Sequence, residues 1–145
     1  MNGNNTYQDR QTVANTGEVL FEQYCKDKNV FFTRFGFDEK NKSLPFFYGI
    51  NPLVRNLPDY YVASKTRGFF VMVKGTANIK KKEVDMIPQF LEWYSTKEVS
   101  LYYAFCFKDQ PVIFKTPHQI IELFEQSEDK KWPDGVIYRN LNVQK

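Results

Sequence analysis

Hydrophobic positions change their spacing several times along the chain, and each change marks the edge of a predicted element. Apolar side chains recur every three or four positions between residues 15 and 27, which is typical of an amphipathic helix. Asn15 followed by Glu18 forms a capping-box-like helix start. The run 100–107 is almost entirely apolar, so we expect a strand that is covered on both faces.

The other segments complete an alternating order of helices and strands. Asp85 can cap a helix whose buried side would carry Ile87, Leu91 and Tyr94, and Thr116 followed by a proline predicts another helix start. In chain order the predicted elements are a helix at 15–27, strands at 30–35, 58–63 and 69–74, a helix from 85, strands at 100–107 and 111–114, a helix at 116–127 and a strand at 136–138. This order of helices and strands predicts an α/β protein.

Two segments lack a regular pattern. Residues 1–12 are polar and predict a flexible N-terminal tail, which leaves one domain over residues 13–145. Residues 37–56 include two prolines and a glycine, and they predict an irregular connection. Long connections of this kind often carry function.

Composition removes several classes of protein. The 145 residues are 42% hydrophobic, which is enough for a packed core and too much for a disordered chain. Two cysteines and one histidine cannot build a disulfide scaffold or a four-ligand zinc site. No apolar segment is long enough to span a membrane and no signal sequence is visible, so we expect a cytoplasmic protein (in the host cytoplasm, if the chain is viral). The net charge of +3 permits a polyanionic partner.

The predicted hairpin brings one acid and one amine together. A turn centred on Thr66 and Arg67 would place Asp59 directly opposite Lys74, on the same face of the sheet. A carboxylate can hold Mg²⁺ through oxygen, and a neighbouring ammonium can stabilise charge on a phosphate. Together they suit metal-assisted hydrolysis of a phosphodiester bond. An ordinary cross-strand ion pair is the alternative, and spacing alone favours it.

The residues around this pair resemble a known nuclease family. The segment LPDYY at 57–61, a turn, and FVMVKG at 70–75 are similar to the PD-(D/E)xK nuclease superfamily, in its Holliday-junction resolvase, RecB-like and Mrr-like branch. The resemblance implies a restriction-endonuclease-like αβββαβ core, in which helices flank a central mixed β-sheet, here followed by a C-terminal helix-strand extension. It also implies an acidic residue on the first helix, for which Glu18 or Glu22 fits, and a Gln and an aromatic residue on the helix after the lysine, for which Gln89 and Tyr94 fit.

The resemblance also assigns roles. Asp59, Glu18 and Glu22 would hold Mg²⁺ or Mn²⁺, Lys74 would assist the attacking water, and Gln89 would position Lys74 or the DNA backbone. Basic residues expected to contact DNA are Lys65, Arg67, Lys80, Lys81 and Lys82, although such a run can equally be a solvated surface.

The motif departs from the superfamily at Met72, where an Asp or Glu is expected. A thioether is a poor ligand for Mg²⁺, and three outcomes are open. A carboxylate elsewhere could replace the missing one, with Glu18, Glu22, Asp85 and Glu92 as candidates. One carboxylate, a backbone carbonyl oxygen and waters could hold a weak metal, or the site could be inactive and only bind.

The expected function is therefore a divalent-metal-dependent DNA endonuclease that acts as a homodimer on branched or structured DNA. The alternative is a catalytically degenerate nuclease fold that binds nucleic acid or a protein partner without cleavage. A third hypothesis is a structural or assembly protein that reuses the fold.

Overall fold

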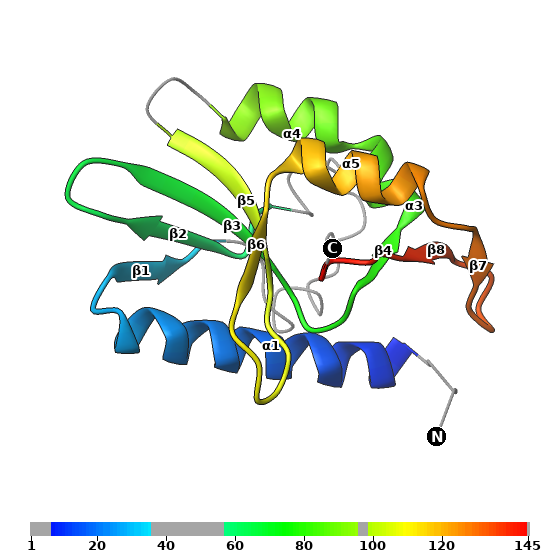
Figure 1. Ribbon diagram of the computed structural model, residues 1–145, viewed down its shortest axis with the longest axis horizontal. Helices are drawn as coiled ribbons and strands as arrows, with labels where there is room; N and C mark the ends of the chain where they lie inside the picture. Colours follow the sequence, from blue (N-terminus) through cyan, green and yellow to red (C-terminus); the bar gives the residue numbers. More distant parts are fainter. Residues whose placement is uncertain (1–6, 36–56, 96–98, 145) are drawn as a thin grey trace, which may run out of the picture.

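The computed structural model describes residues 7–35, 57–95 and 99–144, and they form two β-sheets with flanking helices (Figure 1). The elements in chain order are α1 (Tyr7–Asp27), β1 (Phe31–Arg34), β2 (Tyr60–Ala63), β3 (Gly68–Lys74), β4 (Asn78–Lys80), α3 (Lys81–Asp85), α4 (Ile87–Tyr94), β5 (Val99–Phe105), β6 (Ile113–Lys115), α5 (Pro117–Glu125), β7 (Lys130–Lys131) and β8 (Ile137–Asn140). None of the helices in these described ranges is long and apolar enough to cross a membrane.

The larger sheet has five strands in the order β1-β2-β3-β5-β6. Its first three strands are antiparallel neighbours, whereas β3 and β5 run parallel from the Gly68–Val99 pair to the Lys74–Phe105 pair. The parallel pair needs a crossover connection, and β4, α3 and α4 supply it. The predicted mixed sheet and the order αβββαβ are thus confirmed, with β4 as an unpredicted strand inside the crossover.

Helices cover both faces of this sheet, so its central strands are buried (Figure 1). On one face α1 packs through Phe21 and Cys25 against Val71 and Ala104. On the other face the helices α3, α4 and α5 cover the remaining side chains of β3 and β5, which include Met72, Tyr103 and Phe105. This arrangement confirms the prediction that the run 100–107 is covered on both sides.

Two glycines let α1 approach the end of β3 closely. A Cβ atom on Gly17 would lie 2.9 Å from the Cα of Gly75, and one on Gly75 would overlap the carbonyl oxygen of Val13. Neither position has room for a side chain while the backbones keep this separation. The close approach sets α1 beside Lys74 and brings the next helical residue, Glu18, to the same edge of the sheet.

Two predicted helix starts are wrong, and each has a physical reason. The helix α1 begins at Tyr7, so Asn15 lies inside it, because the turn that contains Val13 packs against Gly75 at the end of β3. Asp85 ends α3 and does not cap a helix, and Met86 separates α3 from α4. Pro88 lies in the first turn of α4 and has no N–H to continue the hydrogen bonds of α3, so the chain begins a new helix there.

The predicted start of α5 is confirmed in detail. The backbone N–H of Gln119 donates to the Thr116 hydroxyl at 3.2 Å, and the Thr116 N–H donates to the Gln119 side chain at 2.9 Å. This is a complete capping box, which local sequence alone can specify. The predicted irregular connection at 37–56 lies outside the described residues. The division into a tail and one domain stays a prediction.

Candidate functional site

The hairpin register differs from the predicted one by two residues. Tyr60 pairs with Val71 and Tyr61 with Phe70, so Asp59 lies beside Met72 and not directly opposite Lys74. The cause is the turn, which is closed by the Ser64 N–H donating to the Arg67 carbonyl at 2.9 Å and therefore begins one residue earlier than expected. Because side chains alternate along a strand, a shift of two leaves Asp59 and Lys74 on the same face.

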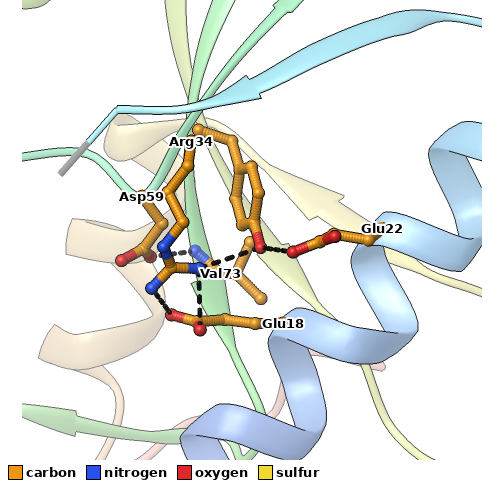
Figure 2. A network of polar contacts seen from close by, with 6 residues as sticks. Glu18, Glu22, Arg34, Asp59 and Val73 are labelled. Carbon is orange, nitrogen blue, oxygen red and sulfur yellow. Dashed lines mark hydrogen bonds and ion pairs between the residues drawn. The ribbon is translucent and has the colours of Figure 1, made fainter. Parts of the chain in front are cut away.

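Asp59 lies just before β2, and its side chain accepts a hydrogen bond from the main chain of β3. Its Oδ2 accepts a hydrogen bond of 2.7 Å from the Val73 N–H (Figure 2), and its Oδ1 has no such bond within the described residues. Burial of the carboxylate raises the pKa of Asp59 to about 6, against the lowering effects of the Val73 N–H and of Lys74. The backbone therefore fixes one oxygen and leaves the other available to a ligand.

Lys74 ends β3 and forms an ion pair with Glu83 from α3. Its Nζ donates to both carboxylate oxygens of Glu83, at 2.8 Å to Oε2, and the two side chains are 24% and 18% exposed. The same ammonium group also acts electrostatically on Asp59. Lys74 thus interacts with two acids, by direct contact with Glu83 from the crossover helix and electrostatically with Asp59 at the start of β2.

Glu83 was not among the predicted site residues. The sequence predicts a second helix that begins at Asp85, which would place Glu83 in a loop. Among the residues after β3, only Asp85 and Glu92 were therefore candidates to replace the acid expected at Met72. In the structure α3 begins at Lys81, so Glu83 is helical and reaches Lys74. Asp85 and Glu92 are exposed. The feature of the sequence that could have indicated Glu83 as a site residue is its short separation from Lys74, the last residue of β3.

Tyr103 is a second residue that sequence reasoning missed. It pairs with Met72 in the β3–β5 ladder and is fully buried, and its hydroxyl has no hydrogen-bond partner among the described residues. Burial raises the pKa of this hydroxyl well above its usual value, and the charges of Glu83 and Asp59 raise it further. Both carboxylates therefore lie within electrostatic reach of Tyr103.

On the α1 side a network of polar groups satisfies Glu18 and Glu22 (Figure 2). Arg34 donates from Nη1 and Nη2 to the two carboxylate oxygens of Glu18, at 2.9 and 3.1 Å. Its Nη1 also donates to the Tyr60 hydroxyl at 3.0 Å, and that hydroxyl donates to Glu22. Two acids expected to bind a metal are thus already bonded to other side chains.

The structure does not gather the other predicted residues around Lys74. Gln89 lies exposed in the first turn of α4, and its side chain has no hydrogen bond with the described residues. Lys65 and Arg67 lie at the hairpin turn, at the opposite end of β3 from Lys74, and Arg67 donates to the Ser100 hydroxyl at 2.9 Å. The exposed Lys80, Lys81 and Lys82 directly precede Glu83.

The residues present fit a hydrated divalent cation better than a fully protein-ligated one. Within the described ranges no group of three His, Cys, Asp or Glu residues could hold one ion. Mg²⁺, however, usually keeps several waters and is bound through one or two carboxylates together with a substrate phosphate. Asp59 and Glu83 are the candidates for those carboxylates, because both act electrostatically on the Tyr103 hydroxyl and both interact with Lys74.

A comparison with solved structures identifies the fold. The chain is similar to Hjc, a Holliday junction resolvase from the archaeal hyperthermophile Archaeoglobus fulgidus, with a TM-score of 0.52, 12% sequence identity and coverage of 89% of both chains. No protein-family model matches the sequence, and no curated protein matches it. The likeness confirms the predicted restriction-endonuclease-like fold.

Proposed function

We propose that this protein is a divalent-metal-dependent DNA endonuclease of the PD-(D/E)xK superfamily, acting on branched DNA. The observation that carries the proposal is Lys74 at the end of β3, which forms an ion pair with Glu83 and acts electrostatically on Asp59. Glu83 offers, from α3, the second carboxylate that Met72 does not provide. The fold likeness to a resolvase supports the proposal, and the choice of branched DNA follows from that likeness alone.

In the proposed mechanism the site residues divide three tasks. A bound Mg²⁺ or Mn²⁺ would supply a water of lowered pKa and polarise the phosphate. Asp59 would hold the ion through Oδ1, since Oδ2 is fixed by the Val73 N–H, and Glu83 would be a second ligand. Lys74, released from Glu83, would donate to the attacking water or to a phosphate oxygen and stabilise the developing charge.

Substrate binding and subunit number belong to the same proposal. The exposed Lys80, Lys81 and Lys82 directly precede Glu83 and would contact the phosphates that flank the reacting bond. A homodimer would place two such sites on the two strands of a junction. Glu18 and Glu22, which are bonded to Arg34 and Tyr60, would shape the α1 side of the site.

Cleavage assays test this proposal directly. Purified protein is incubated with supercoiled, linear, single-stranded and four-way-junction DNA in Mg²⁺ or Mn²⁺, with EDTA as the metal-free control. We expect the substitutions Asp59→Ala, Lys74→Ala and Glu83→Gln each to reduce cleavage by a factor on the order of 100 or more. Glu92→Gln, which changes an exposed acid on α4, should leave cleavage unchanged. If the wild-type protein cuts none of these substrates in either metal, the endonuclease proposal fails.

A second candidate function is DNA binding without cleavage. The ion pairs Arg34–Glu18 and Lys74–Glu83 favour it, because the protein neutralises these acids with its own cations. Tight binding of a four-way junction, with no nicking of any substrate, would support this second function over the first.

A further inference from the structure

The Tyr103 hydroxyl is the polar group of this site that the proposed mechanism does not use. Tyr103 is fully buried on β5, and no described residue accepts from or donates to its hydroxyl. Leaving a buried hydroxyl without a partner is unfavourable, whereas a phenylalanine would fill the same space without that penalty. A tyrosine at this position therefore indicates a polar partner that is not part of the described chain.

The surroundings of the hydroxyl indicate the chemistry of that partner. Tyr103 faces Met72 across the β3–β5 ladder, and Met72 lies beside Asp59. The charges of Glu83 and Asp59 both reach the hydroxyl, and Lys74 is bonded to Glu83 at the same end of β3. Two carboxylates around a neutral donor suit a cation that brings its own water molecules.

We propose that Tyr103 is a positioning residue whose hydroxyl donates a hydrogen bond to a water of a hydrated divalent cation held between Asp59 and Glu83. The proposal rests on the metal site of the proposed function and assigns it a residue directly beside Met72. A tyrosine phenol is protonated at neutral pH and burial raises its pKa further, so the O–H is available as a donor. A neutral phenol is a poor direct ligand for a hard cation, but outer hydrogen bonds orient the inner shell and typically change metal affinity by about 10 to 100-fold.

The test is Tyr103→Phe, which removes only the hydroxyl oxygen. Tyr102→Phe is the matched control, because Tyr102 is the neighbouring tyrosine on β5, lies on the opposite face and packs against Phe69 with ring centroids 5.5 Å apart. For each protein, the melting temperature without metal and the Mn²⁺ binding isotherm are measured in the absence of DNA. We expect Tyr103→Phe to raise the metal-free melting temperature and to weaken Mn²⁺ binding by about 10 to 100-fold. Tyr102→Phe should weaken Mn²⁺ binding by less than a factor of about two.

Each contrary result has a definite meaning. A lower metal-free melting temperature in Tyr103→Phe would show that the hydroxyl has a partner within the protein, and unchanged Mn²⁺ affinity would show that it does not serve the cation; either overturns the inference. Mn²⁺ binding that is absent, or that Asp59→Asn leaves unchanged, overturns it as well. Tyr103-dependent Mn²⁺ binding without cleavage of any DNA would instead contradict the endonuclease proposal and support this inference.

Discussion

Asp59 has a structural role in the fold, and the proposed mechanism gives the same residue a chemical one. Its Oδ2 continues the hydrogen bonding of β3 through the Val73 N–H, which fixes the carboxylate without a charged partner of its own. Lys74 forms its ion pair with Glu83, so the Asp59 carboxylate remains partly uncompensated while it is partly buried. Such a group is costly to fold in its ionised form and is ready to receive a cation.

The raised pKa of Asp59 gives a pH-dependent prediction for the metal-free protein. Its folded pKa of about 6 exceeds the ordinary aspartate value of 3.8, so between these values the folded state binds more protons than the unfolded state. Stability should therefore fall as the pH rises through this window. Asp59→Asn keeps an acceptor for Val73 and removes the charge, so we expect the variant to be more stable at pH 8 by up to about 2 kcal/mol.

Urea denaturation at several pH values measures this effect. The difference between Asp59→Asn and the wild-type protein should shrink below pH 6 and disappear below about pH 4, where the wild-type carboxylate is protonated in both states. A variant that is less stable than the wild-type protein at pH 8 would contradict the burial argument. Glu92→Gln, at an exposed acid of α4, serves as the control and should show no such pH-dependent difference.

Among the elements, α1 and the end of β3 form the contact that positions the α1 side of the site. Gly17 and Gly75 allow the helix to lie directly against the strand end, and Glu18 is the next helical residue. The Arg34–Glu18 pair then ties α1 to β1. Packing of these two glycines therefore determines where an acid of the first helix lies.

Substitution of these glycines should produce a graded loss of stability. The Cβ of Gly75→Ala would overlap the Val13 carbonyl oxygen, so α1 must move, at an expected cost of about 1–3 kcal/mol. Gly17→Ala meets Gly75 at 2.9 Å and gains helix propensity, so its loss should be smaller. Chemical denaturation of both variants checks the order, and two equally stable variants would contradict the proposed close approach.

Across the molecule, positive charge is distributed unevenly relative to the site. Lys80, Lys81 and Lys82 adjoin Glu83, whereas Lys65 and Arg67 lie at the other end of β3. A seven-residue strand spans about 20 Å, so under the proposed function a short DNA segment at Lys74 would reach the first group more readily than the second. The two groups can therefore be separated by experiment.

The salt dependence of DNA binding measures their separate contributions. Replacing Lys80, Lys81 and Lys82 together with Gln should weaken junction binding and reduce the slope of log K against log salt by up to about 0.9 for each phosphate that these lysines neutralise. The combined change Lys65→Gln and Arg67→Gln is the charge-reducing control and should have the smaller effect. If both changes leave the slope at its wild-type value, these residues do not contact DNA.

Local spacing was enough to predict the order of the elements, the capping box at Thr116, the double burial of β5 and the common face of Asp59 and Lys74. The capping box depends on residues three apart, and strand alternation holds for any register shifted by two residues. The resemblance to the nuclease superfamily, and not local spacing, identified Met72 as the position where an acid is expected.

The register, the start of α3 and the partners of the charged residues emerged only from the folded chain. The register depends on which residues close the hairpin turn, and α3 depends on Pro88 interrupting a longer helical segment. Glu83, Tyr103 and Arg34 enter the site through contacts between elements that are distant in sequence or joined by a crossover. No local pattern encodes such contacts, because they form only when the sheet and its covering helices are assembled.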